Sequence, residues 1–195
     1  MDVLDVSLKM SPLDPIKPTP EELRVLIDSA PKTPDERYEK AVSDLNLTED
    51  KYSRWCALGS AAKSSLEVGQ IDEALSYAEE LTDLIPSYQD DWNYGNAIQD
   101  SNIVFGIKAL LSGDAILAQE FLLAAGRSPG SPQMNSFGPN MTLAKALVEA
   151  GHRDGVLTYL DLCRVFWSHH RGLLDHWHLQ ISEGGYPDFN ANLIY

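Results

Sequence analysis

A glycine that recurs at the boundary between two helical patterns places the strongest constraint on what this chain can fold into. Gly69, Gly113 and Gly151 are each followed by a small or apolar residue five, nine and twelve positions later. Steps of four and three residues place side chains on one face of a helix, and glycine is the residue that most often follows a helix. Each glycine therefore predicts a turn between two helices. The glycines are 44 and 38 residues apart, so long connections must join the units.

Small residues precede each glycine at matching positions, where they would let two antiparallel helices approach closely. The pairs are Ala61-Ala62, Phe105-Gly106 and Leu143-Ala144. Over residues 48–168 the pattern resembles the tetratricopeptide repeat. The first unit matches best, with Gly69, Ala74, Ala78 and Pro86 in place, whereas the third has Val156 where the family usually has alanine. The resemblance implies an all-α fold, an antiparallel helix-pair stack of the α-solenoid kind.

Flanking segments complete a predicted fold of about nine or ten helices. Residues 1–18 form an extended, proline-rich lead-in, which also fits a PxxP ligand. Residues 19–47 hold N-terminal helices near 20–29 and 34–46, because a Thr-Pro-x-Glu capping box opens each one. Thr48 is predicted to cap a helix near 49–67. Residues 169–195 supply a capping helix, about 170–183, and an apolar tail.

The tail, residues 186–195, is unusually apolar for the end of a chain. Its large side chains are Tyr186, Phe189, Leu193, Ile194 and Tyr195. Exposed together they would form an adhesive strip, so we expect the tail to pack against the helices, along their groove or over the last pair. A contact between two copies of the chain is the alternative.

Composition limits the classes of partner. At 44% apolar residues the chain can bury a sizeable core, and its formal net charge of −14 repels phosphate backbones and anionic lipid. We therefore expect neither nucleic acid nor a membrane as a partner. The start of the sequence lacks the features of a signal peptide, and no stretch is long and apolar enough to cross a membrane. Cys56 and Cys163 form no CxxC pair and are expected to be buried thiols in a reduced, cytoplasmic protein.

The acids are unevenly distributed. Residues 1–100 hold 21 acids and 9 bases, whereas residues 101–195 hold 8 and 6, and no lysine or arginine occurs between Lys63 and Lys108. This stretch is either a solvated helix face or a patch for a basic partner segment. Within it, Trp92 and Tyr94 beside Asp90 and Asp91 form either a recognition surface or an ordinary anchored turn.

The loop 126–140, rich in proline, glycine and polar residues, is the most unusual stretch. It is either a bridge between helix pairs, with Asn140 capping the next helix, or a binding loop facing the helix predicted at 96–111. From Phe121 to Gly151, the loop and its flanks resemble a group of uncharacterised bacterial proteins that have the same Gly-Arg-Ser-Pro-Gly-Ser-Pro run. The resemblance implies a shared architecture and transfers no function. The candidate binding residues are Asp100, Asn102, Arg127, Ser131, Gln133, Asn135 and Asn140.

No pattern indicates catalysis, a metal or a cofactor. The histidines 169, 170, 176 and 178 lack the spacing of a zinc site, so surface or packing roles are favoured over metal binding. The sequence therefore favours a non-enzymatic module of the bacterial cytoplasm that binds a protein or peptide on the concave face of the stack. If the acidic patch takes part, the partner has a basic segment. The alternative is a small-molecule-binding protein or an enzyme with its site at the 126–140 loop.

Overall fold

A computed structural model describes residues 19, 21 and 30–194 of the chain. The chain divides into residues 1–32 and 33–195, and the fold below is that of the second unit. The predicted lead-in and the predicted helix near 20–29 lie outside the described residues, apart from Thr19 and Glu21.

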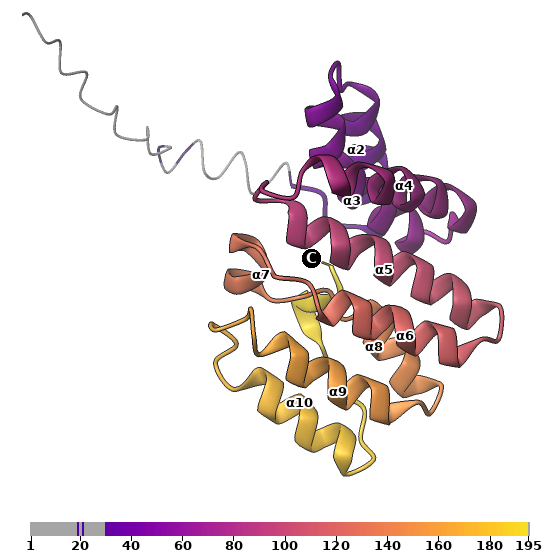
Figure 1. Ribbon diagram of the computed structural model, residues 1–195, viewed down its shortest axis with the longest axis vertical. Helices are drawn as coiled ribbons and strands as arrows, with labels where there is room; N and C mark the ends of the chain where they lie inside the picture. The colour runs from indigo at the N-terminus through magenta and orange to yellow at the C-terminus, as the bar shows by residue number, and fades with distance from the viewer. Residues whose placement is uncertain (1–18, 20, 22–29, 195) are drawn as a thin grey trace, which may run out of the picture. The chain divides into compact units, whose positions relative to one another are not determined.

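Residues 33–194 contain only helices and the connections between them (Figure 1), which confirms the all-α class for this part of the chain. The helices are α2 (Pro34–Asn46), α3 (Lys51–Glu67), α4 (Ile71–Leu84), α5 (Tyr94–Leu111), α6 (Ala115–Gly126), α7 (Pro132–Phe137), α8 (Thr142–Glu149), α9 (Arg153–Cys163) and α10 (Leu173–Ser182), with 3₁₀ turns at Ile85–Ser87 and Asn190–Leu193.

Side-chain caps determine where several helices begin. The predicted capping box of α2 is present, since the Glu36 amide donates to Thr33 Oγ1 and the Thr33 amide donates to Glu36 Oε2, both over 3.2 Å. The start of α3 differs from the prediction. Asp50 caps it by accepting the amides of Tyr52 and Ser53, while the Thr48 hydroxyl donates back to the Leu45 carbonyl.

The predicted glycine turns share one geometry. Gly69, Gly113 and Gly151 all have a positive φ, between 79° and 87°. In each turn the amide after the glycine donates to a carbonyl five residues earlier, which is the hydrogen bond of a Schellman motif. The same bond follows α10, where the Gly185 amide donates to the Gln180 carbonyl over 2.7 Å. Glycine therefore ends four helices by one mechanism, because L side chains rarely adopt this φ.

The helices pack mainly against their neighbours in the sequence. The most extensive contacts join α3 to α4 and α5 to α6, and α5 also contacts α3, α4 and α8. Ala74 and Ala118 are fully buried, as the spacing from the glycines predicts. One continuous apolar cluster extends from α5 to α10 and the tail, whereas two smaller clusters join α2, α3 and α4 to α5.

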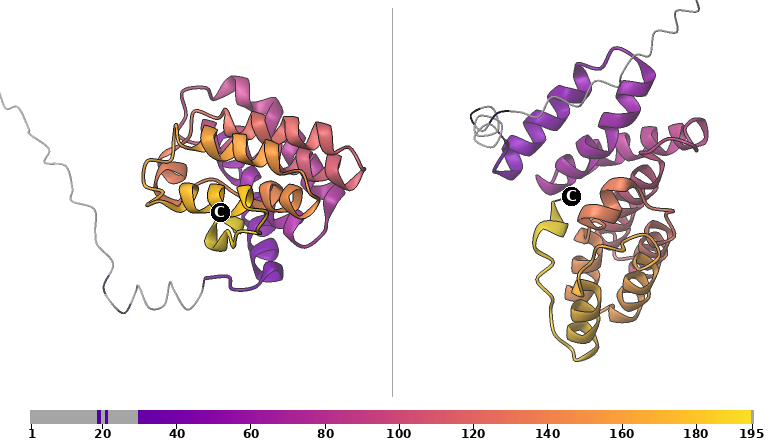
Figure 2. Two further views of the ribbon diagram at one scale, coloured as in Figure 1. Left: turned by 90° about the horizontal axis from the view of Figure 1, so that it is seen from below. Right: turned by 90° about the vertical axis from the view of Figure 1, so that its left-hand side faces the viewer.

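The tail packs against the helices, as expected (Figure 2). Phe189 is buried, and its ring lies edge-on to Trp177 of α10 with centroids 5.0 Å apart. Tyr186 and Ile194 remain 65% and 52% exposed, although the Arg153 guanidinium lies 4.7 Å above the Tyr186 ring. The prediction of a packed tail is therefore confirmed for its middle and wrong for these two side chains, whereas Tyr195 lies outside the described residues. Among the described helices, none is long and apolar enough to span a membrane.

Candidate functional site

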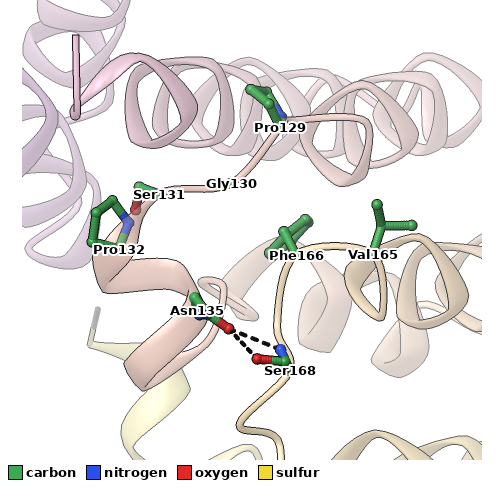
Figure 3. Close-up of a pocket in the computed structure, with 8 residues that line it drawn as sticks. All are labelled: Pro129, Gly130, Ser131, Pro132, Asn135, Val165, Phe166 and Ser168. Atoms are coloured by element: carbon green, nitrogen blue, oxygen red, sulfur yellow. Dashed lines mark hydrogen bonds between the residues drawn. The ribbon is translucent and has the colours of Figure 1, made fainter.

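A recess of about 380 Å³ lies between the loop that contains α7 and the turn that follows α9 (Figure 3). Val165 is 84% exposed at its rim, and Pro129 and Pro132 are exposed on the loop. The lining residues are Pro129, Gly130, Ser131, Pro132, Asn135, Val165, Phe166 and Ser168. The recess is open, its lining combines proline, valine and phenylalanine with serine and asparagine, and it includes two of the predicted binding residues, Ser131 and Asn135.

The loop wall is held against the start of α5. Ser128 donates to the Gly95 carbonyl over 2.8 Å, and Ser131 donates to Asn96 Oδ1 over 2.6 Å while accepting the Met134 amide as the cap of α7. A Cβ on Gly95 would lie 1.9 Å from the Gly130 carbonyl oxygen, so the two backbones touch. The loop therefore has a fixed shape.

The opposite wall is joined to the loop by hydrogen bonds at Asn135 and by packing at Gly130. Asn135 Oδ1 accepts hydrogen bonds from the Ser168 amide over 3.0 Å and the Ser168 hydroxyl over 2.7 Å (Figure 3). Gly130, with a φ of +79°, packs so closely on Phe166 that a Cβ would lie 2.4 Å from that side chain's own Cβ. These contacts set the width of the recess.

A buried polar network lies behind the loop. The Tyr159 hydroxyl donates to the Asn140 carbonyl over 3.0 Å and accepts from Gln99 Nε2, and Gln99 Oε1 accepts the Asn140 amide over 3.0 Å. Burial is the main reason that the pKa of the Tyr159 phenol lies well above its usual value. The phenol is therefore neutral, and its hydrogen bonds connect α5 and α9 to the loop that precedes α8.

The tail extends this network. Asn192 Nδ2 donates to the carbonyls of Phe137 and Pro139 over 3.0 Å each, and the Met141 amide donates to the Asn192 carbonyl over 2.7 Å. Leu193 and Ile194 then line a small cavity together with residues of α3, including Ser64 and Glu67. The tail thus passes from α10 across the start of α8 to α3.

The remaining predicted binding residues are separated from the recess or from one another. Asp100 is buried and pairs with Lys63 of α3 over 3.0 Å. Burial raises the pKa of Asp100, and the Lys63 ammonium opposes that shift. Asn102 donates to the Ile98 carbonyl within α5, and Asn140 is buried and accepts the Thr142 amide at the start of α8. Arg127 and Gln133 are exposed on the loop.

Sequence reasoning missed the wall formed by Val165, Phe166 and Ser168. The available signal was the apolar run Val165-Phe166-Trp167, which follows α9 directly and precedes the start of α10. Such a run outside a helix has to pack on another element, and here Phe166 packs on Gly130. Its partner is 36 residues away in the sequence, which no local pattern reveals.

The acidic stretch is partly neutralised within the protein. Three of its nine acids form ion pairs with bases of α2 and α3, namely Glu67 with Arg37, Glu80 with Arg54 and Asp100 with Lys63. Glu73 accepts hydrogen bonds from the hydroxyls of Tyr38 and Tyr77. Asp72, Glu79, Asp83 and Asp90 are exposed. The exposed acids, rather than the whole stretch, are available to a partner.

The histidines and cysteines add no reactive group to the recess. His169 Nδ1 lies 3.2 Å from the Asn135 carbonyl oxygen, and His170 Nδ1 accepts the Gly172 amide. No metal-binding cluster of histidine, cysteine and acidic side chains occurs in the described part of the chain. Cys163 is buried, and Cys56 is only partly buried.

Comparison of the chain with protein-family models, curated proteins and solved structures finds no match.

Proposed function

We propose that this chain is a protein-binding module of the helical-repeat kind, which takes an extended segment of a partner at the recess between the α7 loop and the turn after α9. The observation that carries the proposal is the 84% exposure of Val165 at the rim of a recess whose other wall is proline-rich and fixed. An isolated exposed valine is ordinary, but one at the rim of a preformed recess offers a partner an apolar contact beside the polar groups of Ser131, Asn135 and Ser168.

The fixed shape of the recess supports binding. The loop is held by Ser128, Ser131 and Asn135, so a partner would not have to order it. The open rim favours a peptide over a small metabolite, because small ligands bind in sites that enclose most of their surface.

The position of the tail also bears on where a partner would bind. In a tetratricopeptide-like stack, the binding face is formed by the first helix of each pair, here α3, α5 and α8. The tail contacts the start of α8 and lines a cavity with α3, so it occupies part of that face. We therefore place the partner at the recess, at the ends of the helices, rather than on the concave face that the sequence favours.

The test is selection of peptides from a random library on the immobilised protein, followed by affinity measurement with Val165→Glu. A charge placed in an apolar contact should weaken binding about tenfold or more, since its desolvation costs well over 1 kcal/mol. Leu179→Glu is the matched control, because Leu179 is 54% exposed on α10 and outside the recess. Equal affinity of both variants and wild type would reject the recess, and selection that yields no peptide would reject the function.

A further inference from the structure

A second recess, of about 450 Å³, lies at the connection between α4 and α5 and is separate from the site proposed above. It is lined by Pro86, Ser87, Tyr88, Gln89, Asp90 and Asp91. The lining combines an aromatic ring with two carboxylates, and further aromatic residues adjoin it.

Four aromatic rings form a connected group beside this recess. Tyr88 stacks on the fully buried Trp55, with ring centroids 4.9 Å apart and planes inclined by 24°. Tyr52 lies 5.8 Å from Tyr88, and the Trp92 indole N–H donates to the Tyr52 hydroxyl over 3.2 Å. Tyr52 and Trp92 are 44% and 45% exposed. The rings are thus anchored at one end of the group and exposed at the other.

Asp91 is held in the middle of this group by neutral donors. Its carboxylate accepts hydrogen bonds from the Trp55 indole, the Tyr52 hydroxyl and the Asn93 amide, at 3.2, 3.1 and 2.8 Å. Burial alone would raise the pKa of Asp91, but these hydrogen bonds outweigh it and the pKa is lower than usual. Asp91 is therefore ionised at neutral pH, yet no ion pair within residues 33–194 includes it or the exposed Asp90.

The surroundings of the recess strengthen its negative charge. The sequence has no lysine or arginine between Lys63 and Lys108. On α3, Arg54 is engaged by Glu80 and Lys63 by Asp100, which leaves Lys51 as the exposed base of that helix. Hydrogen bonds from Ser53 are the main reason that the pKa of Asp50, at the start of α3, is also lowered.

We infer that this recess is a docking site for lysine or arginine side chains of a basic protein segment. An aromatic face attracts a cation through its quadrupole, and tryptophan does so best. Ionised carboxylates beside the rings attract the same charge and repel acidic segments, so the site selects basic partners. The exposed ring of Trp92 and the carboxylates of Asp90 and Asp91 supply these contacts.

The probe is a fluorescent ten-residue peptide of alternating arginine and serine, with the glutamine–serine peptide as its uncharged counterpart. Trp92→Ala should weaken binding of the arginine peptide about two- to fivefold, the effect expected of one exposed cation–π contact. Relative to Trp92→Ala, Trp92→Phe should retain part of the affinity, because it keeps an aromatic face, although a weaker one than tryptophan, and loses the hydrogen bond to Tyr52. Leu111→Ala is the control, since Leu111 is 66% exposed on α5 and its loss also leaves the charge unchanged.

Charge is tested separately, because a protein of net charge −14 attracts any basic peptide to some degree. Asp90→Asn and Glu79→Gln remove the same charge from two exposed positions, one in the recess and one on α4. Asp90→Asn should weaken binding more. Equal affinities for this pair, or for Trp92→Ala and Leu111→Ala, would overturn the proposal and leave only general attraction by net charge. Thermal melts establish that each variant is folded, and none of these substitutions alters the α7-loop recess.

Discussion

Residues 33–93 and residues 94–194 are held together by different interactions. In the first region, α2, α3 and α4 share small apolar clusters rich in alanine, and the ion pairs Arg37–Glu67 and Arg54–Glu80 join the helices at the surface. In the second, one continuous apolar cluster extends over the helices and the tail, and buried hydrogen bonds centred on Tyr159 and Asn140 join helices to loops. The first region therefore has charged pairs between its helices, whereas the second joins its helices and loops through buried hydrogen bonds between neutral groups.

The two recesses differ in charge. The α7-loop recess has no charged residue in its lining and exposes the apolar side chain of Val165 at its rim. The recess between α4 and α5 has two carboxylates in its lining, Asp90 and Asp91, and neither forms an ion pair within residues 33–194.

The largest expected effect comes from the tail. Phe189→Ala should destabilise the protein by about 3–5 kcal/mol, because the ring is buried against Trp177 and its loss leaves a cavity. Ile194→Ala, at a 52% exposed position, should change stability by about 0.5 kcal/mol or less. Urea denaturation of both variants measures the difference. Equal midpoints would show that the tail is not part of the second region's core.

Two alanines compare the regions directly. Ala118→Leu should cost about 2–3 kcal/mol and Ala74→Leu about 1–2 kcal/mol, because overpacking is relieved where neighbours can move. Ala118 lies in the continuous cluster, whereas Ala74 is surrounded by half-buried residues such as Leu66 and Leu75. Thermal melts of the two variants give the order. If the melting curves of both variants coincide with that of the wild type, the prediction that these alanines lie at close helix crossings is wrong.

A smaller effect is expected from the surface ion pair of α2. Arg37→Ala should speed amide exchange in α2 by up to about fivefold, since exposed or partly exposed pairs contribute about 0–1 kcal/mol. Exchange in α9 should not change. Raising the salt concentration from about 0.01 to 1 M should speed amide exchange in α2 of the wild type by a similar factor, because the screening length of charges falls from about 30 to 3 Å. Hydrogen exchange followed by mass spectrometry resolves both helices, and acceleration in α9 as well would erase the contrast between the regions.

The smallest expected effect is the pH dependence due to Asp100, because burial and Lys63 act on its pKa in opposite directions. The folded pKa is raised above the unfolded value of about 3.9, so the folded state holds the proton longer. This contribution to stability is present below the unfolded pKa and is lost as pH rises through the folded pKa. Wild type should therefore lose stability relative to Asp100→Asn as pH rises from about 4 towards neutrality. Urea midpoints of both proteins measure this, and a constant difference across that range would contradict it.

Helix ends could be predicted from the sequence wherever they depend on neighbouring residues. The Thr33-Pro34-Asp35-Glu36 run placed α2 at its observed bounds, because the capping bonds span only three residues. Two nearby side chains compete to cap α3, which explains why the predicted cap, Thr48, is wrong. The Asp50 carboxylate accepts two amides of the first turn, whereas the Thr48 hydroxyl donates to the Leu45 carbonyl of the preceding helix. The last helix begins at Leu173 rather than 170, because Gly172 adopts a φ of 83° before it.

The candidate site could be predicted only in part. The composition of the loop 126–140 predicts a binding role as one of two alternatives, and two of its candidate residues, Ser131 and Asn135, line the recess. Ser131-Pro132 also starts α7, through a hydroxyl cap followed by proline as at Thr33-Pro34 of α2, and the helices predicted from the sequence do not include it. Ser168 and Gly95 bond residues 33 positions away, so the three-dimensional fold, and not the local sequence, determines which polar groups remain accessible.

The two cysteines happen to lie one in each region, which gives the chain a chemical reporter for either part. Cys56 on α3 is partly buried, and burial raises its thiol pKa despite a hydrogen bond with Tyr52. Cys163 on α9 is fully buried, and the same cause raises its pKa further. Only the thiolate reacts with an alkylating reagent, so burial slows the reaction both by raising the pKa and by blocking access. The reagent should reach the partly buried Cys56 through small fluctuations, but Cys163 only when α9 separates from the core. The two alkylation rates of a single sample thus report how often each region opens.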